Sequence, residues 1–175
     1  IVVMDNVYET SISSTSKPNG KKWDYQAGYT EQQYNWLKAD LSNVENPQEK
    51  LLIFCGHIPF RAGGSNNGSN VNTDKFYSEV LSLMTQFNEA HIMIGHTHYS
   101  QNWIHANYKC QNGKPVYEHI HGAACGAWWS TYNTDKFGGP SGYSIYSIEG
   151  NSIVDWTAKG TGRPAGRDGQ RTGYP

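Results

Sequence analysis

The sequence predicts an α/β fold in which strands and helices alternate along the chain. Two short apolar runs, Leu51–Cys55 and residues 91–94, have the composition of strands that are covered on both faces. A stretch with the apolar spacing of an amphipathic helix lies between them, and another lies before the first run. Because a strand, a crossover helix and a second strand almost always form a right-handed parallel unit, both strands should end at one edge of a sheet.

The first third of the chain should hold one strand and one helix. Residues 1–4 form a β-branched apolar run and are interpreted as a buried strand. Residues 11–28 are polar, contain a proline and a glycine, and are interpreted as a loop. A helix should begin at Thr30, because Thr30 and Gln33 have the spacing of a capping box. Apolar residues then recur at helical spacing: Tyr34, Leu37, Leu41 and Val44.

The elements after the first buried strand can be predicted in the same way. Residues 61–73 have almost no apolar side chains and are interpreted as an irregular loop. Residues 74–89 should form the second amphipathic helix. The C-terminal third has short alternating runs, with a hairpin turning at Gly150 and Asn151. Residues 163–175 carry no apolar pattern and are expected to form an irregular tail.

Each of the two buried strands is followed by glycine and then histidine. Gly56-His57 follows the first strand, and Gly95-His96-Thr97-His98 follows the second. Ligands of parallel sheets bind beyond the carboxyl ends of the strands, so the three imidazoles should converge there. His96 and His98 would point to the same side if the extended conformation continued. Since imidazole is the commonest protein ligand of borderline transition metals, His57, His96 and His98 are predicted metal ligands.

The remaining four histidines are interpreted as structural or exposed residues. His91 begins a strand and His105 lies in an alternating run. His119 and His121 flank one isoleucine, and this spacing places them on one face of a strand. They are therefore the stronger candidates for a further role.

The histidine motifs resemble those of a known family. Gly56-His57-Ile58-Pro59 and Gly95-His96-Thr97-His98, preceded by the segment TEQQYNWLKADL, look like the last two metal motifs of calcineurin-like metallophosphoesterases. The resemblance extends over about residues 1–99. It implies a four-layer α/β/β/α sandwich, two divalent metal ions (Fe, Mn or Zn) and hydrolysis of a phosphate-ester substrate. By position, His57 and His96 would bind one metal ion and His98 the other.

The sequence departs from this family at its first three motifs. The patterns D-x-H, G-D-x-x-D and G-N-H, which supply the carboxylates and the histidine that acts as general acid, do not occur. The resemblance therefore implies a missing N-terminal half and no catalytic residue within this chain. Residues 1–122 would be the C-terminal half of the catalytic domain, and residues 123–175 a small, mostly β appendage and tail. The block GAWW followed by SGY resembles the region that accompanies secreted bacterial members.

Composition limits the other possibilities. The formal charge is −1 and only 17% of the residues are charged, which leaves no basic surface for nucleic acid or anionic lipid. No apolar run approaches the roughly 20 residues of a membrane span. The three cysteines include no C-x-x-C pair, so they indicate neither a disulfide framework nor a cysteine zinc site. The abundance of Gly, Tyr, Trp, Asn and Ser favours a periplasmic or extracellular location.

Two alternative functions remain open at this stage. In the first, His57, His96 and His98 surround a single zinc ion of a mononuclear hydrolase, with water in the fourth position. In the second, Trp128 and Trp129 belong to a non-catalytic glycan-binding module. Arg61, four residues after His57, could reach a phosphate group through two hydrogen bonds. The sequence names neither the substrate nor its class, monoester or diester.

Overall fold

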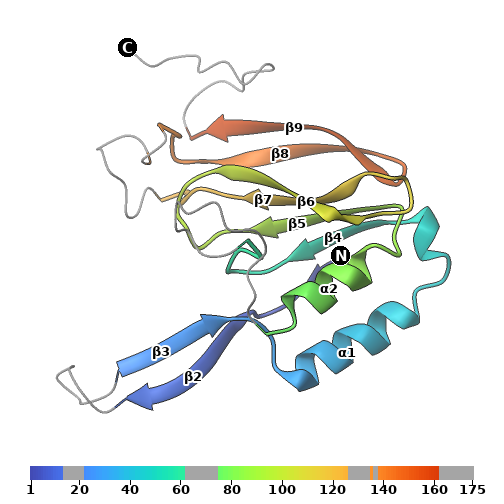
Figure 1. The fold of residues 1–175 in the computed structure, drawn as a ribbon. Helices are drawn as coiled ribbons and strands as arrows, with labels where there is room; N and C mark the ends of the chain where they lie inside the picture. The colour runs from blue at the N-terminus through green and yellow to red at the C-terminus, as the bar shows by residue number, and fades with distance from the viewer. Residues whose placement is uncertain (14–21, 62–74, 126–134, 136–137, 162–175) are drawn as a thin grey trace.

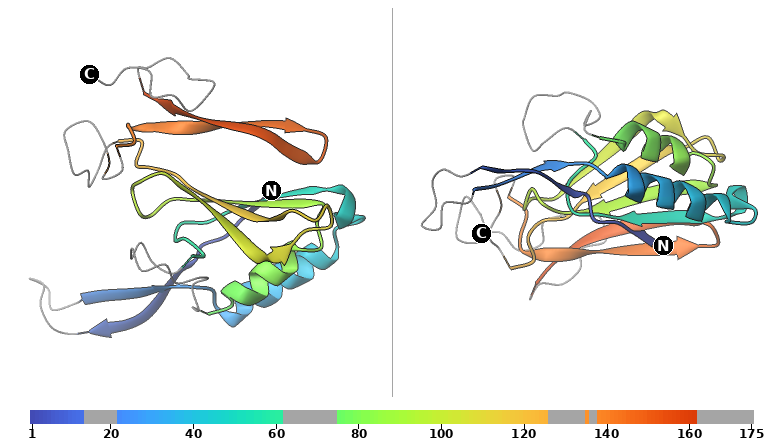
Figure 2. Two further views of the ribbon diagram at one scale, coloured as in Figure 1. Left: turned by 45° about the horizontal axis from the view of Figure 1, so that its top comes forward. Right: turned by 90° about the horizontal axis from the view of Figure 1, so that it is seen from below.

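The computed structural model describes residues 1–13, 22–61, 75–125, 135 and 138–161, which form three layers (Figure 1). A five-stranded sheet lies in the middle, two helices cover one face, and a hairpin lies over the other face (Figure 2). The elements are β1 (Val2–Val3), β2 (Val7–Ser13), β3 (Lys22–Ala27), α1 (Glu31–Ser42), a 3-10 turn (Pro47–Glu49), β4 (Leu51–Cys55), α2 (Tyr77–Met84), β5 (Glu89–Ile94), β6 (Gln101–Lys109), β7 (Pro115–Ile120), β8 (Gly142–Glu149) and β9 (Ser152–Gly160).

The central sheet has the strand order β1-β4-β5-β7-β6. β1, β4, β5 and β7 pair in parallel, and only β6 at the edge is antiparallel. Ile53 of β4 pairs with His91 of β5, and His91 pairs with Tyr117 of β7. The predicted α/β class and the parallel strand-helix-strand unit are therefore confirmed. The carboxyl ends of the four parallel strands lie at one edge of the sheet.

Helix α1 begins as its capping box predicts. The amide of Gln33 donates to Thr30 Oγ1 at 3.1 Å, and the amide of Thr30 donates to Gln33 Oε1 at 2.8 Å. Leu37 and Leu41 are buried against the sheet, while Trp36 on the opposite side is 54% exposed. The cap fixes the start of the helix, and the apolar spacing decides which side is buried.

Helix α2 is shorter than the predicted helix over residues 74–89. It begins after Phe76, whose φ of 68° is left-handed and therefore cannot belong to the helix. It ends at Met84, because the amide of Phe87 donates to the Met84 carbonyl at 3.2 Å and turns the chain into β5. Glu89, predicted as the helix end, is the first residue of β5.

The prediction of a loop over residues 11–28 is wrong. Two antiparallel strands, β2 and β3, pair across this region, with a bulge between Glu9 and Ser11. Figure 1 shows that this ribbon projects away from the central sheet. A two-stranded ribbon that leaves the sheet does not need an apolar face, so its strands give no hydrophobic periodicity for the sequence to reveal.

An aromatic cluster fills the space between the sheet and the helices. Phe60 stacks on Tyr77 with ring centroids 4.2 Å apart, and Phe54 meets Phe60 edge to face at 5.7 Å. Tyr29 contacts all three rings and is fully buried. Because Phe60 follows the histidine motif of β4, this packing anchors the chain just beyond His57.

The β8–β9 hairpin covers the opposite face of the sheet. It turns at Gly150, which has a φ of 58°, as predicted. Tyr146 of β8 and Trp156 of β9 pack edge to face on His119 of β7, with ring centroids 5.1 and 5.0 Å away. The small β region at the C-terminus is confirmed, whereas the domain division at residue 122 stays a prediction.

Some predictions fall outside the described residues. These are the loop after Arg61, the Trp128-Trp129 pair and the tail over residues 163–175. Within the described ranges, no helix is long and apolar enough to cross a membrane. Cys55, Cys110 and Cys125 are free thiols, of which Cys110 is buried and Cys125 is exposed. A fourth layer, which the four-layer sandwich would require, has no counterpart in the described part of the chain.

Candidate metal centre

His57 stands directly after β4, at the carboxyl edge of the sheet. Its carbonyl accepts a hydrogen bond from the amide of Gly95 at 3.2 Å, so the two glycine-histidine motifs are joined through their backbones. Gly56 lies in a tight space, because a Cβ atom there would come within 3.2 Å of Ile94 Cδ1 and 3.4 Å of Asn6 Nδ2. The chain is therefore closely approached by its neighbours at Gly56. At Gly95, a Cβ atom would meet no described atom within 4 Å.

Asn6 fixes the turn that carries His57. It follows β1, is fully buried, and accepts hydrogen bonds through Oδ1 from the amides of His57 and Ile58, both at 2.9 Å. Its Nδ2 atom donates to the Ile58 carbonyl at 2.6 Å and to the Tyr77 hydroxyl at 2.7 Å. One amide side chain thus satisfies the backbone that turns off β4 and connects it to β1 and α2.

The imidazoles of His57 and His96 are in direct contact. His96 Nδ1 lies 3.2 Å from His57 Nε2, and the ring centroids are 5.0 Å apart. Burial lowers the pKa of His96, and the positive charges of His57 and His98 lower it further. Two facing imidazole nitrogens need a proton or a cation between them, since both cannot present lone pairs.

The backbone of the second motif is not extended. His96 and His98 have φ angles of 67° and 64°, and the amide of Thr97 donates to the Gly95 carbonyl at 2.7 Å. The extended conformation on which the shared direction of the two side chains depended is therefore not present. A left-handed conformation of a residue other than glycine costs of order 1 kcal/mol or more, and such residues concentrate at functional sites. Two of them within three positions therefore indicate that this loop has a functional role.

The His57 and His96 pair fits one edge of a metal coordination sphere. Nitrogen ligands at about 2.0–2.1 Å from a tetrahedral zinc ion lie roughly 3.3 Å apart, close to the observed 3.2 Å. The set is incomplete, however. Within the described ranges, no group of three or more His, Cys, Asp or Glu side chains is arranged to hold a metal ion. Two imidazoles match a metal site that needs further ligands.

His91 and His119 belong to a buried polar chain, not to the candidate centre. His91 Nε2 lies 2.8 Å from Glu89 Oε1, and His91 Nδ1 lies 2.8 Å from His119 Nε2. His119 Nδ1 in turn meets the Asn102 side chain at 2.7 Å. Burial and the charges of His91 and His121 lower the pKa of His119 to about 4, so both rings are neutral near pH 7. Their structural role, as predicted, is confirmed.

His105 and His121 also have structural partners. His105 Nε2 lies 2.9 Å from Glu118 Oε2, in the interior of the sheet layer. His121 Nδ1 donates to the Ile94 carbonyl at 3.0 Å, so in the neutral ring its Nε2 accepts from the Tyr146 hydroxyl at 2.8 Å. His119 and His121 do share a face, and that face meets the hairpin through Tyr146.

Sequence reasoning missed Asn6 and Glu118, the two buried residues that hold the β4 exit. Glu118 is fully buried and accepts hydrogen bonds from the amides of Phe60 and Arg61 at 2.7 and 3.2 Å. A signal existed for Asn6: β1 is parallel to β4, so a polar residue just after β1 reaches the edge where His57 lies. Its neighbour Asp5 accepts a hydrogen bond from the Val7 amide at 3.0 Å. Nothing in the sequence distinguishes Glu118 from a surface carboxylate.

Comparisons with known proteins give two matches. A family model described as the C-terminal region of calcineurin-like phosphoesterase matches residues 118–174. Purple acid phosphatase 18 of Arabidopsis thaliana is 35% identical over 66 residues, which cover 38% of this chain and 15% of the relative. The matched segment therefore spans a small part of that relative. The family match agrees with the α/β fold.

Proposed function

We propose that the chain is part of a calcineurin-like metallophosphoesterase and that it supplies three metal ligands to an enzyme that hydrolyses phosphate esters. In this proposal His57 and His96 bind one metal ion and His98 binds a second. The family supports phosphoester hydrolysis in general, and its members use divalent metals. Iron, manganese and zinc all suit imidazole combined with carboxylate.

The contact between His57 Nε2 and His96 Nδ1 is the observation that carries the proposal. The two residues come from loops after different strands, yet their nitrogens stand at the separation expected for two ligands of one ion. Asn6 holds the first loop in place, and the left-handed backbone of His96 sets the second. Such prior fixing of ligands reduces the cost of forming a metal site.

The chain's own residues would act by holding metal and by setting its position. A metal ion bound by these imidazoles supplies charge that stabilises phosphoryl oxygens and lowers the pKa of bound water. Neutral imidazoles cannot balance the charge of two dications, so carboxylates must come from elsewhere. We assign them, and the general acid, to the N-terminal half that the resemblance implies.

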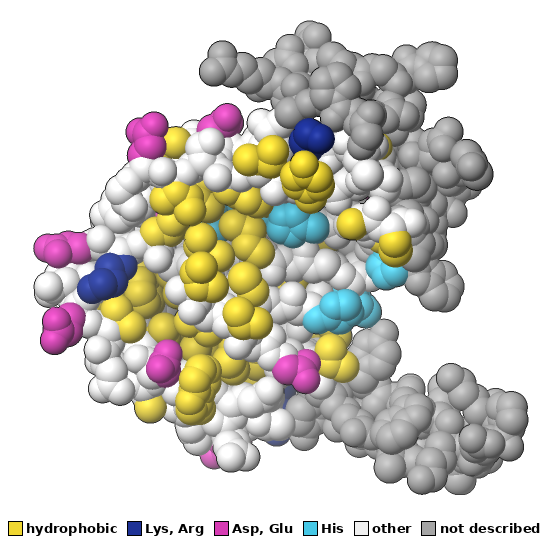
Figure 3. Space-filling model, turned by 180° about the vertical axis from the view of Figure 1, so that it is seen from behind, with side chains coloured by type: hydrophobic (Ala, Val, Ile, Leu, Met, Phe, Trp, Pro, Cys, Tyr) yellow, Lys and Arg dark blue, Asp and Glu magenta, His cyan; other side chains and the backbone are white. Residues whose placement is uncertain are grey.

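The exposed edge of the sheet at β1 supports the proposal that an N-terminal half packs beside it. Among the described residues β1 pairs only with β4, and Val3 there is 74% exposed. Figure 3 shows that hydrophobic side chains cover much of the face behind the view of Figure 1, with histidine side chains beside them. An exposed apolar surface next to a functional edge is typical of a site that another part of a protein covers.

A mononuclear zinc centre made of His57, His96 and His98 has less support. That alternative requires three imidazoles around one point, and the described residues contain no such group. The glycan-binding alternative depends on Trp128 and Trp129, which lie outside the described ranges.

The test uses the complete protein and three chromogenic esters: a phosphomonoester, a phosphodiester and an activated acyl ester. We expect hydrolysis of at least one phosphate ester and none of the acyl ester. A chelator should abolish the activity, and Zn²⁺, Mn²⁺ or Fe²⁺ should restore it. His57→Ala and His96→Ala should each lower kcat at least about 100-fold and reduce the bound metal.

His121→Gln is the matched control, because His121 lies near the same edge but is engaged with Ile94 and Tyr146. It should retain the metal content and the activity within about threefold of the unmodified protein. Phosphatase activity that survives both the chelator and the His57 and His96 replacements would overturn the proposal.

A further inference from the structure

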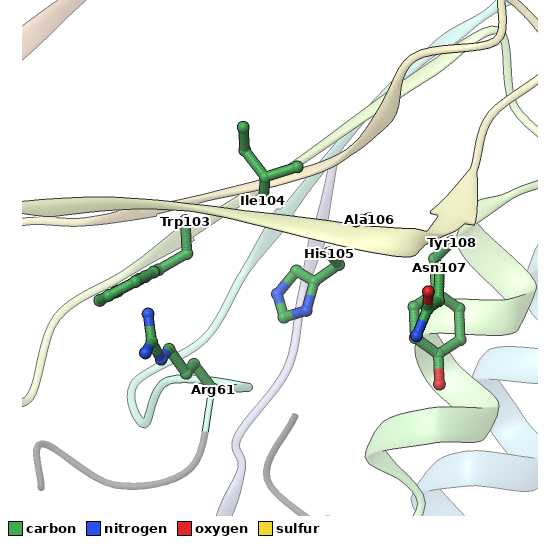
Figure 4. Close-up of a pocket in the computed structure, with 7 residues that line it drawn as sticks. All are labelled: Arg61, Trp103, Ile104, His105, Ala106, Asn107 and Tyr108. Carbon is green, nitrogen blue, oxygen red and sulfur yellow. The ribbon is translucent and has the colours of Figure 1, made fainter. Parts of the chain in front are cut away.

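We propose that a pocket beneath β6 is a second anion-binding subsite, in which Arg61 receives an acidic group on the leaving group of the substrate. The pocket has a volume of about 450 Å³ and lies between strand β6 and the chain that leaves β4 (Figure 4). Arg61, Trp103 and His105 point into it from the two sides. This inference rests on the proposed phosphoesterase function and adds a substrate class to it.

The guanidinium of Arg61 is partly buried and lies on the ring of Trp103. Its central carbon is 3.0 Å from the ring centroid (Figure 4). Stacking uses the face of the guanidinium, while its N–H groups lie in the plane and remain directed outward. Within the described part of the chain, no side-chain hydrogen bond or ion pair of Arg61 occurs. The cation is therefore held in place with its donors unused.

Burial lowers the pKa of Arg61, although the nearby charge of Glu118 acts in the opposite direction. The Glu118 carboxylate makes its hydrogen bonds to groups other than the guanidinium. Its Oε1 accepts from the Phe60 amide, and its Oε2 accepts from the Arg61 amide and from His105. This buried carboxylate thus fixes the backbone of Arg61 and the ring of His105. An anion from solution would accept hydrogen bonds from the N–H groups of the Arg61 guanidinium.

The position of the pocket connects it to the candidate metal centre. Arg61 follows His57 by four residues, so their Cα atoms are no more than about 14 Å apart. Trp103 pairs with Glu118, two residues from the Gln101 and Ile120 pair at the carboxyl edge of the sheet. A phosphate ester bound at the histidines could therefore extend its leaving group over Trp103 to Arg61.

The chemistry of the lining defines the ligand class. One guanidinium supplies paired donors, and the indole ring of Trp103 supplies an apolar surface beside it. This combination suits a flat or aromatic leaving group that carries a carboxylate or a second phosphate. Phosphate esters with a neutral leaving group would gain only the apolar contact.

The direct test measures anion binding to the complete protein after metal removal by a chelator. Inorganic phosphate and benzoate are titrated separately while the side-chain Nε–H resonance of Arg61 is followed by NMR. We expect a saturable shift with at least one of them, and the comparison shows whether phosphate or carboxylate is preferred. The affinities of the variants are measured by isothermal titration calorimetry, in which Arg61→Gln should weaken binding at least about tenfold, and Arg61→Lys by less, since it keeps the charge but loses the paired donors.

The kinetic test compares 4-carboxyphenyl phosphate with phenyl phosphate in the metal-loaded protein. Arg61→Gln should lower the ratio of the kcat/KM for 4-carboxyphenyl phosphate to that for phenyl phosphate about tenfold. His57→Ala is the matched control in the binding test, where it should leave the anion affinity within about twofold.

The two proposals fail in different ways. Arg61-dependent anion binding in a protein that hydrolyses no phosphate ester would support the subsite and overturn the proposed function. Phosphate-ester hydrolysis with an Arg61→Gln variant that changes neither anion binding nor the kcat/KM ratio would overturn the subsite alone.

Discussion

Asn6 shows how one buried amide can position a functional loop. It makes two hydrogen bonds as acceptor and two as donor, and its partners lie on the turn after β4 and on α2. Two of the partners are backbone amides, and the amide of Ile58 would otherwise be buried without an acceptor. Since an unsatisfied buried polar group costs about 1–3 kcal/mol, the Asn6 side chain contributes to stability as well as to the position of His57.

Replacing Asn6 should destabilise the protein and loosen the His57 turn. Asn6→Ala removes all four hydrogen bonds, and we expect the free energy of unfolding to fall by about 3 kcal/mol or more. Asn6→Asp keeps the acceptor for the two amides but places a carboxylate oxygen against the Ile58 carbonyl. It should therefore also be destabilising, because the donor is lost and a charge is buried. Urea unfolding monitored by circular dichroism gives both values.

The control for Asn6 is Asn43→Ala. Asn43 is exposed at the C-cap of α1, and its own amide, not its side chain, makes the cap contacts. Its replacement should change stability by no more than about 0.5 kcal/mol. Equal effects at the two positions would show that the Asn6 network does not carry the predicted energy.

At the scale of elements, the β8–β9 hairpin is docked on the sheet by polar groups. Glu89 of β5 accepts from the Ile153 amide of β9 at 2.9 Å and from Lys114 at 2.7 Å. His119 lies under Tyr146 and Trp156 and joins the chain of hydrogen bonds from Glu89 through His91. When both rings are neutral, each contact along this chain pairs one donor with one acceptor. This requires that Asn102 presents its NH₂ group, and not its oxygen, to His119 Nδ1.

Acid should weaken this docking. Burial and neighbouring histidines lower the pKa of His119 from 6.5 to about 4, so between these values the unfolded chain binds a proton that the folded chain does not. Stability is therefore complete above pH 6.5 and falls as the pH decreases toward 4, by a maximum on the order of 3 kcal/mol. Thermal unfolding across pH 4–8 measures this slope.

The Glu89 carboxyl adds to the same trend at lower pH. Burial alone would raise its pKa, but hydrogen bonds from Lys114, His91 and the Ile153 amide outweigh it and lower the pKa to about 2. Its contribution is present above pH 4.5 and is lost toward pH 2.

The variant His119→Phe keeps a ring under the hairpin and removes one titrating group, so stability should vary less between pH 4 and 6.5. An unchanged slope would contradict the assignment to His119.

Elements with an apolar pattern could be predicted, and those without one could not. The capping box of α1, the buried strand β4 and the turn at Gly150 each have a local cause that the sequence displays. The β2–β3 ribbon projects from the sheet and has no such pattern. In the candidate site, the glycine-histidine motifs revealed which residues meet, but Asn6 and Glu118 depend on distant partners that no local spacing encodes.

For the whole molecule, the arrangement of layers explains why the candidate centre is incomplete. The parallel strands bring His57 and His96 together at one edge, and the helices and hairpin fix that edge from both faces (Figure 2). No carboxylate joins these imidazoles within the described residues. Two dications a few ångströms apart repel strongly unless anionic ligands reduce their charge. The number of bound metal ions should therefore depend on how much of the protein is present.

This dependence can be measured by comparing metal stoichiometry in the complete protein and in residues 1–175 alone. Native mass spectrometry and elemental analysis should give two metal ions for the complete protein and no more than one, held weakly, for residues 1–175. In the complete protein, His57→Ala and His96→Ala should release one ion, whereas His98→Ala should release the other. Circular dichroism must first confirm that residues 1–175 are folded. Two tightly bound ions in residues 1–175 would show that the imidazoles need no outside carboxylates, and the division of ligands between two halves would then be wrong.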